Sequence, residues 1–226
     1  MMTDFLNALS NAQYWNIIWD NTLITLIMLG FTWLFTILIG LPWGIMLFLS
    51  SPGQLLSAPN FYRIFSFATN ILRSIPFLIL IVVLLPLTFQ LMGTKMGIKG
   101  AIFPLVIGSA PFFARLAETA FREVDRGVIE AAESMGSPLR TIIMKVLLPE
   151  ARPSLIAGVT VTGILILSYT AMAGTVGAGG LGDVAVRFGF HRNMAELMYL
   201  IVIVLIIMVQ VMQWTGDWLI RHYTRK

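Results

Sequence analysis

Long apolar segments constrain the fold of this chain more than any other feature of its sequence. The first of them, residues 22–49, contains no Asp, Glu, Lys or Arg. A helix needs about 20 consecutive apolar residues to cross the hydrocarbon core of a bilayer. Five segments meet this need, and the predicted spans are residues 22–49, 75–93, 100–121, 154–176 and 196–219. We therefore expect an all-α membrane protein with five transmembrane helices.

The composition agrees with a membrane protein that has little soluble mass. Of the 226 residues, 58% are hydrophobic and only 12% are charged, whereas soluble domains have about 45–50% apolar and about 25% charged residues. No polar stretch is long enough to fold separately, so residues 1–226 are predicted to form one transmembrane domain. The chain has no cysteine, and His191 and His222 have no clustered partner, so no metal site is predicted.

The segments that border the spans are less regular. Phe5 to Trp19 is amphipathic and aromatic, as expected for a segment at the membrane interface. Residues 1–21 hold no Lys or Arg, so no cleavable signal peptide is predicted. Residues 54–73 leave two alternatives open, an interfacial elbow or an early extension of the second span. Kinks are predicted at the prolines within the spans, namely Pro42, Pro76, Pro86, Pro104 and Pro111.

The distribution of Lys and Arg predicts the orientation, because basic residues favour the cytoplasmic side of a membrane. With the N-terminus outside and the C-terminus inside, eleven of the 15 basic residues fall on the cytoplasmic side. These are Arg63, Arg73, Arg115, Arg122, Arg126, Arg140, Lys145, Arg152, Arg221, Arg225 and Lys226. The outer side receives Lys95, Lys99, Arg187 and Arg192. This distribution explains the net charge of +4 without nucleic-acid binding.

The longest polar connection, residues 122–153, is predicted to form two short helices joined by a turn. Residues 128–135 are good helix formers, and Gly136 suits the left-handed position that follows a helix. Ser137 is the expected N-cap of the second helix, with Pro138 as its first residue. Pro149 is expected to end that helix, because the residue before a proline avoids the α region.

The second helix of this connection is amphipathic. Its apolar face is formed by Leu139, Ile142, Ile143 and Val146. Two alternatives stay open for this face: it packs on the chain's own spans, or it lies in a groove on a partner protein. Glu130 and Glu133 share one face of the first helix and could contact basic or amide groups of such a partner.

Three motifs in the connection and three elsewhere point to a known family. Glu130-Ala131-Ala132, Gly136 and Leu148-Pro149 resemble the EAA signature of ABC-importer membrane subunits. Three further stretches look like the methionine-import branch of that family. They are Arg73 to Phe77 (RSIPF), Ala110 to Phe112 (APF) and Ser168 to Asp183 (SYTAMAGTVGAGGLGD).

The resemblance implies the fold, the partners and the role of the connection. The fold would be that of a type I ABC importer permease, in which residues 122–153 form a cytoplasmic coupling loop. The chain would act as a homodimer in the bacterial inner membrane, with two ATPase subunits that bind ATP and Mg²⁺ and a substrate-binding lipoprotein outside. The implied ATPase-coupling residues are Glu130, Ala131, Ala132, Glu133, Gly136, Leu148 and Pro149. No cofactor would bind to this chain itself.

Two features inside the spans are candidates for the transport path. Arg115 and Glu118 lie three residues apart in the third span, where a charge is costly. They form either a structural pair near the inner interface or part of the path or gate. Small residues from Ala171 to Asp183 are expected to allow close packing or a broken helix. The side chains and backbone expected to meet substrate there belong to Tyr169, Met172 and Gly174.

These observations leave three functions open. The first is a permease that moves methionine and related amino acids by alternating access, driven by a separate ATPase. The second is a permease for another small solute, and the third is a non-transporting scaffold that recruits a soluble partner. The chain has neither an H-E-x-x-H motif nor a serine–histidine arrangement, so it is not predicted to be an enzyme.

Overall fold

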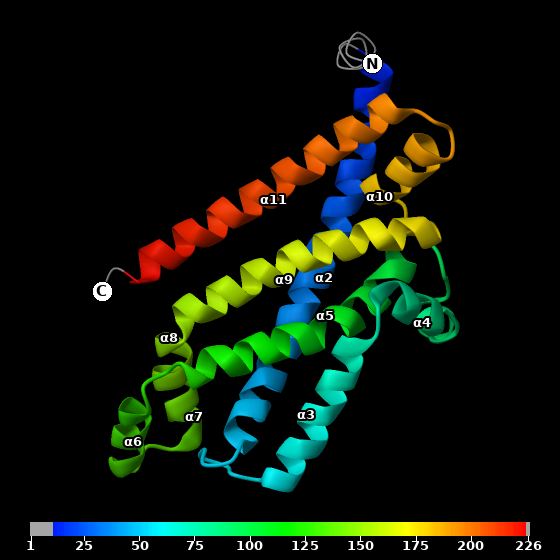
Figure 1. Ribbon diagram of the computed structural model, residues 1–226. Helices are drawn as coiled ribbons and strands as arrows, with labels where there is room; N and C mark the ends of the chain where they lie inside the picture. The colour runs from blue at the N-terminus through cyan, green and yellow to red at the C-terminus, as the bar shows by residue number, and fades with distance from the viewer. Residues whose placement is uncertain (1–10, 225–226) are drawn as a thin grey trace. The chain divides into compact units, whose positions relative to one another are not determined.

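The computed structural model describes residues 11–224, and every regular element in that range is helical (Figure 1). In chain order the helices are α2 (Ala12–Ser50), α3 (Pro59–Ser74), α4 (Phe77–Met92), α5 (Gly97–Arg122), α6 (Arg126–Ser134), α7 (Leu139–Ile142), α8 (Leu148–Glu150), α9 (Arg152–Ala173), α10 (Leu181–Val184) and α11 (Ala195–Thr224). Three wider π-helical turns join them, η1 (Ile143–Leu147), η2 (Gly174–Ala178) and η3 (Ala185–Phe190). The first residues of the predicted lead-in, 5–10, lie outside the described residues.

Between residues 11 and 224, four helices are long and apolar enough to cross a membrane by themselves. They are α2, α5, α11 and the continuous stretch Arg152–Ala178 formed by α9 and η2. Helices α3 and α4 reach the required length only as a bent pair, so the structure supports four or five spans. The prediction of an all-helical membrane protein is confirmed at this level.

The predicted second span, residues 75–93, corresponds to α4, but α4 is too short to cross a bilayer by itself. Helix α4 has only 16 residues, or about 24 Å at a rise of 1.5 Å per residue, which is shorter than a bilayer core of about 30 Å. Pro76 takes an extended ψ of 129° before α4, and Ile75, as the residue before a proline, also disfavours the helical region. The break at Pro76 thus separates α3 from α4.

Helix α2 also differs from its prediction at its start. It runs without interruption over 39 residues from Ala12, so the described part of the predicted interfacial lead-in is the first part of the same helix. Pro42 lies inside α2, and Pro86 lies inside α4. Pro104 and Pro111 likewise lie within the continuous α5. Of the prolines predicted to kink a span, only Pro76 separates two helices.

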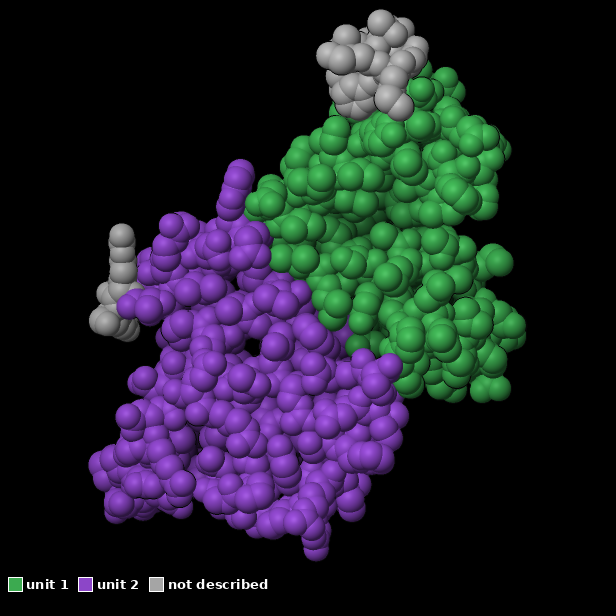
Figure 2. Space-filling model, in the orientation of Figure 1, with its two compact units in different colours: residues 1–34, 75–108, 163–212 green, residues 35–74, 109–162, 213–226 purple. Residues whose placement is uncertain are grey.

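The chain divides into two compact units, each made of three segments (Figure 2). Unit 1 comprises residues 1–34, 75–108 and 163–212, and unit 2 comprises residues 35–74, 109–162 and 213–226. Unit 1 therefore holds the start of α2, the helix α4 and the end of α9. Unit 2 holds α3 and the whole coupling loop.

In unit 2, α2 and α5 approach closely because small residues face each other. A Cβ atom added to Gly44 would lie 2.6 Å from the Cβ of Ala117 and 2.7 Å from the carbonyl oxygen of Ala114. The hydroxyls of Thr36 and Ser109 form a buried hydrogen bond of 2.6 Å between the same two helices. Small residues allow such contacts in membrane proteins, where packing and hydrogen bonds hold helices together.

In unit 1, the chain folds back after α9. Val176 and Gly177 leave the helical region, with Gly177 at a φ of 92°. Helix α10 then packs so tightly on the start of η2 that a Cβ added to Gly174 would clash with the backbone nitrogen of Asp183. The backbone N–H of Leu181 donates a 2.9 Å hydrogen bond to the hydroxyl of Thr25 on α2. The expected close packing and broken helix are both present.

Candidate functional site

The first helix of the coupling loop begins earlier than predicted. Helix α6 starts at Arg126 rather than at residue 128, because Asp125 serves as its N-cap. The Asp125 carboxylate accepts a 2.6 Å hydrogen bond from the backbone N–H of Gly127. An acidic N-cap is favourable because it satisfies an unpaired N–H at the positive end of the helix. The signal was present in the sequence as an aspartate before the helix formers.

The turn after α6 has the predicted geometry. Gly136 adopts the left-handed conformation with a φ of 70°. Its N–H donates to the carbonyl of Glu133 at 2.9 Å, and the N–H of Ser137 donates to the carbonyl of Ala132 at 3.2 Å. This pair of bonds is the Schellman motif that closes many helices. The role of Gly136 in ending α6 is therefore confirmed.

The start and end of the second helix differ from their predictions. Ser137 is not its N-cap: Pro138 holds that position with an extended ψ of 148° and no side-chain hydrogen bond. Pro149 does not end the helix, which continues through α7, η1 and α8 to Glu150. The wider η1 turn, where the N–H of Leu148 donates to the carbonyl of Ile143, shifts the hydrogen bonding just ahead of the proline.

The apolar face of the second helix packs inside unit 2. Ile142 is only 2% exposed and lies in one cluster with Phe48 of α2, Phe121 of α5 and Ile129 of α6. The other predicted members of the face, Leu139, Ile143 and Val146, pack against the same cluster. Of the two alternatives for this face, packing on the chain's own helices is the one that occurs. The coupling loop is thereby joined to α2 and α5 by a continuous apolar core.

The predicted coupling residues separate into an inner and an outer set. Ala132 is buried in the core of unit 2, and Leu148 and Pro149 are half-buried. The exposed members are Glu130, Ala131, Glu133 and Gly136. Met135, beside them, has 76% of its surface exposed. This outer set is available to a partner protein.

A small polar pocket adjoins the outer set. It has a volume of about 290 Å³ and is lined by Gly53, Gln54 and Leu55 of the loop after α2 and by Arg126, Ile129, Glu130 and Glu133 of α6. Arg126 and Glu130 form an exposed ion pair of 2.8 Å in this wall. The sequence placed both glutamates on one face, as observed, but gave no signal that the α2–α3 loop would lie beside them.

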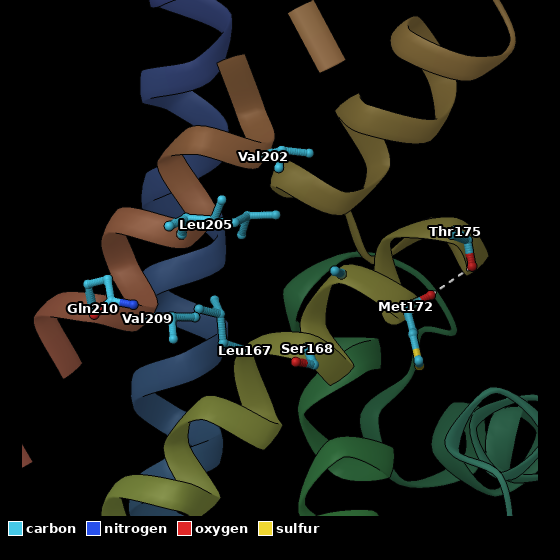
Figure 3. Close-up of a pocket in the computed structure, with 10 residues that line it drawn as sticks. Leu167, Ser168, Met172, Thr175, Val202, Leu205, Val209 and Gln210 are labelled. Atoms are coloured by element: carbon cyan, nitrogen blue, oxygen red, sulfur yellow. Dashed lines mark hydrogen bonds between the residues drawn. The ribbon is translucent and has the colours of Figure 1, made fainter. Parts of the chain in front are cut away.

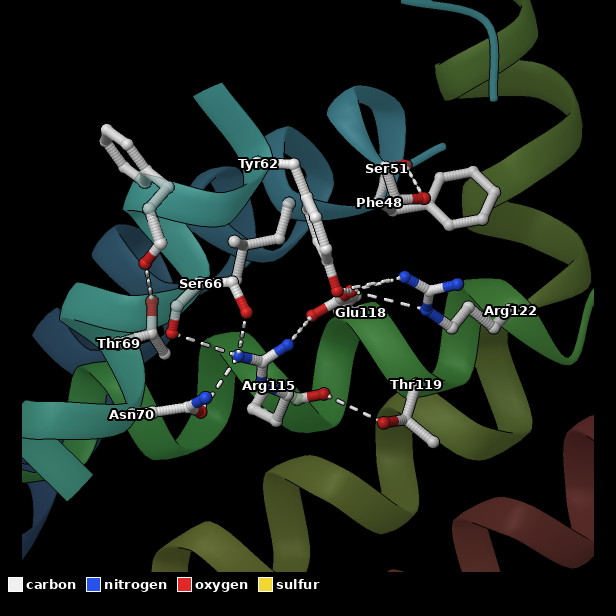
Figure 4. A network of polar contacts seen from close by, with 12 residues as sticks. Phe48, Ser51, Tyr62, Ser66, Thr69, Asn70, Arg115, Glu118, Thr119 and Arg122 are labelled. Atoms are coloured by element: carbon white, nitrogen blue, oxygen red, sulfur yellow. Dashed lines mark hydrogen bonds and ion pairs between the residues drawn. The ribbon is translucent and has the colours of Figure 1, made fainter. Parts of the chain in front are cut away.

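A buried network of charged and polar groups joins α3 to α5 in unit 2 (Figure 4). The Glu118 side chain is 2% exposed and pairs with Arg115 at 2.5 Å and with Arg122 at 2.8 Å. The Tyr62 hydroxyl of α3 donates a 3.0 Å hydrogen bond to the same carboxylate. A buried carboxylate needs such partners because its desolvation is costly.

Arg115 extends the network toward α3. Its guanidinium donates to the Ser66 hydroxyl at 2.8 Å and to the Asn70 side-chain oxygen at 3.0 Å. The predicted pairing of Arg115 with Glu118 is confirmed. Sequence reasoning missed the α3 partners, since residues 49 and 45 positions apart meet only through the tertiary fold. It also missed Arg122, although its position four residues after Glu118 on one helix was a recognisable signal.

A second pocket, of about 580 Å³, lies between α9 and α11 in unit 1 (Figure 3). We call it the α9/α11 pocket. One wall comes from Leu167, Ser168, Ala171, Met172 and Thr175, and the other from Val202, Leu205, Ile206, Val209 and Gln210. Its lining is mostly apolar and contains no charged residue. Its volume lies within the range of about 300–1,000 Å³ that is usual for small-molecule sites.

The three residues predicted to meet substrate do not share one location. Met172 lines the α9/α11 pocket and is 44% exposed. Tyr169 instead stacks on Phe77 of α4, with ring centroids 4.1 Å apart and an angle of 6° between the rings. Gly174 is buried against α10. Gln210 was missed, although a lone amide inside an apolar span is a recognisable signal.

Residues 11–224 combine four or five candidate spanning helices with an exposed helical loop packed on two of them, which is the architecture of a membrane protein with a surface for a soluble partner. Comparison with known families agrees. The chain belongs to the family of binding-protein-dependent transport system inner membrane components, which matches residues 40–226.

Individual relatives extend the similarity to nearly the whole chain. A Pasteurella multocida protein named "Probable D-methionine transport system permease protein MetI" is 41% identical over 95% of this chain and 99% of its own length. The methionine import system permease protein MetP of Bacillus subtilis is 49% identical over 76% of this chain and 78% of its own. A chain of the MetNI methionine ABC transporter, solved in inward-facing conformations, matches with a TM-score of 0.93 and 40% identity. That match covers 95% of this chain and all of the other.

Proposed function

We propose that this chain is the membrane-spanning subunit of an ATP-driven importer for methionine and related amino acids. The observation that carries the proposal is the match to the MetNI methionine transporter, which combines a TM-score of 0.93 with 40% identity over 95% of the chain. The alternative of a non-transporting scaffold has no comparable support. ATP hydrolysis would reside in a separate subunit, so the chain itself is not an enzyme.

The coupling loop is the part of the chain that would receive the motion of the ATPase. Its exposed residues Glu130, Ala131, Glu133 and Gly136 form the contact surface, and Ala132, Leu148 and Pro149 support it from within. The core that contains Phe48 and Phe121 links this surface to α2 and α5. A closely packed core transmits displacement, so movement of the loop would move these helices.

Alternating access follows if the two states of the ATPase bind the coupling loop differently. ATP and Mg²⁺, bound by the partner, can shift the membrane helices only through such a difference in affinity. The chain would then alternate between inward- and outward-facing states. A substrate-binding lipoprotein would deliver methionine on the outer side.

The assembly that fits this role is a homodimer of the chain with two ATPase subunits in the bacterial inner membrane. The chain would lie with its N-terminus outside and its C-terminus inside, as the distribution of Lys and Arg predicts. Five spans result if α3 and α4 cross the membrane together. In this orientation the coupling loop faces the cytoplasm, where the ATPase and its nucleotide are found.

Co-purification with the ATPase subunit and measurement of ATP hydrolysis test this proposal. The complex is expected to remain intact in detergent, and its ATP hydrolysis in liposomes is expected to rise when the binding protein and methionine are added. A chain that recruits the ATPase but never stimulates hydrolysis would be a scaffold instead. Stimulation by another solute, without any response to methionine, would assign a different substrate.

A further inference from the structure

Gln210 occupies an unusual position in the longest apolar stretch of α11. From Leu200 to Met212 it is the only residue with a polar side chain. It lies 15 positions after Ala195 in a helix of 30 residues, so it is about 22 Å from the start of the helix at 1.5 Å per residue. A group at this depth in a spanning helix lies near the middle of the membrane.

The side chain of Gln210 is exposed in a single copy of the chain. Lipid tails can neither donate nor accept hydrogen bonds, so an exposed amide at membrane depth needs a polar environment from another source. Intramembrane polar residues usually face a bundle interior or an aqueous path for this reason. The exposure of Gln210 therefore indicates that this side of α11 does not face lipid alone.

The α9/α11 pocket gives Gln210 a chemical context. The amide stands at one wall, beside Val209 and Leu205 of the same helix, and Ser168 and Met172 of α9 form the facing wall (Figure 3). The Ser168 hydroxyl donates only a long bond of 3.3 Å to the carbonyl of Ile164, so its lone pairs are left to accept. The pocket thus combines apolar walls with neutral donors and acceptors.

We infer that the α9/α11 pocket is a binding site for a zwitterionic amino acid with an apolar side chain, an inference that rests on the proposed function. The Gln210 amide hydrogen-bonds the charged head group, and the apolar walls at Met172, Leu205 and Val209 hold the side chain. The site selects against lysine, arginine, aspartate and glutamate. Their net charge would be left uncompensated because no charged residue lines the pocket.

The selectivity has a physical basis in the walls as well. Met172 is unbranched and polarizable, so it adapts to a flexible side chain of similar kind. Neutral hydrogen bonds hold a zwitterion less tightly than ion pairs would. A permease needs such weak binding, because its substrate must enter and then leave the site.

Thiol labelling tests the location of the pocket, and the absence of native cysteine makes it specific for this chain. We expect Met172→Cys, in the complete complex, to react with a water-soluble methanethiosulfonate at least about tenfold faster than Ile207→Cys. Ile207 is an exposed residue of α11 that does not line the pocket. Saturating methionine is expected to slow labelling of the first variant and leave the second unchanged, and the wild-type complex corrects for cysteines of the partners.

Other labelling results would overturn the inference. Reaction only with a lipid-soluble maleimide would mean that the pocket faces lipid. Absence of reaction with either reagent would mean that a second copy of the chain covers it. Labelling that methionine does not slow would mean that the substrate passes elsewhere.

Transport kinetics test the role of Gln210. In proteoliposomes, we expect Gln210→Leu to raise the KM for methionine about tenfold and to leave the maximum rate within about twofold, with partial recovery in Gln210→Asn. The matched control is Gln213→Leu, on the same helix but outside the pocket. If the wild type and Gln210→Leu both transport methionine with the same KM, the proposed site is overturned but the proposed function is not. If the wild-type complex takes up no methionine, the proposed function is overturned.

Discussion

Glu118 shows how a charged residue is accommodated within a helix of the membrane domain. Its carboxylate is buried, and both Arg115 and Arg122 pair with it on the same helix. Tyr62 adds a hydrogen bond from α3. The group therefore fastens α3 to α5 next to Phe121, which belongs to the core that supports the coupling loop.

Replacing Glu118 alone should destabilise the protein strongly. Removal of one partner from a buried ion pair costs roughly 3–5 kcal/mol, and Glu118→Ala would remove one acceptor shared by two arginines and a tyrosine. We expect a clear loss of thermal stability in detergent, measured by the melting temperature of the purified chain. Thr119→Val, at an exposed neighbouring position, is the control. The double variant Arg115→Met with Glu118→Leu should melt closer to the wild type, and equal losses in the single and double variants would contradict the pairing argument.

Gly136 is the second residue whose chemistry makes a sharp prediction. Its φ of 70° is strained for a β-branched side chain but is accessible to asparagine. Gly136→Val should disturb the turn after α6 and reduce the amount of ATPase that co-purifies, by about tenfold or more. Gly136→Asn should keep most of it. Co-purification of both variants at wild-type yield would rule out a need for this turn in docking.

At the scale of elements, the coupling loop has two distinct surfaces. Its outer surface carries Glu130 and Glu133 beside the polar pocket, and its inner surface belongs to the core of unit 2. Substitutions on the outer surface are therefore expected to alter partner binding without changing the stability of the chain.

Reversing one charge on the outer surface tests whether partner binding can change while the stability of the chain does not. Glu130→Lys removes the ion pair with Arg126 and places two like charges four residues apart. Because exposed pairs contribute little to stability, the melting temperature should change little, whereas the affinity for the ATPase should fall about tenfold. Glu150→Lys, an exposed acid of the same loop outside the pocket, is the matched control. Equal ATPase affinities for wild type and Glu130→Lys, by surface plasmon resonance, would remove Glu130 from the contact.

The return of the chain after α9 depends on a contact between elements that are distant in sequence. The Thr25 hydroxyl accepts the hydrogen bond from Leu181 at the start of α10. Thr25→Val would leave this buried N–H unpaired at a cost of about 1–3 kcal/mol, which should lower the melting temperature. Thr22→Val is the matched control, because the Thr22 hydroxyl bonds to the carbonyl of Ile18 within α2. A melting temperature as high as that of the control would show that the bond contributes nothing.

Local signals allowed the elements to be predicted well, and tertiary contacts explain where the prediction was wrong. Charge-free runs revealed α2 and α11, and Gly136 revealed the end of α6, because hydropathy and backbone conformation act within a few residues. The continuation of the helix past Pro149 depends on the η1 turn, and the fold-back after Gly177 depends on Thr25. Neither feature follows from local propensity. Tertiary contacts also explain why Met172 lines the α9/α11 pocket, whereas Tyr169 stacks on Phe77 of α4.

At the scale of the whole molecule, the two functional regions fall in different units. The coupling loop belongs to unit 2 and the α9/α11 pocket belongs to unit 1. Helices α2, α5, α9 and α11 each contribute residues to both units. If the loop receives the motion of an ATPase as proposed, these continuous helices are the route along which a displacement would act.

Uptake of labelled methionine into proteoliposomes tests the central claim most directly. The chain is reconstituted with its ATPase and binding protein, with ATP and Mg²⁺ on the side of the coupling loop. The account predicts ATP-dependent accumulation of methionine, abolished in Gly136→Val and reduced by excess unlabelled methionine but not by lysine or glutamate. Accumulation without ATP, or ATP hydrolysis with no methionine entering the vesicles, would contradict it.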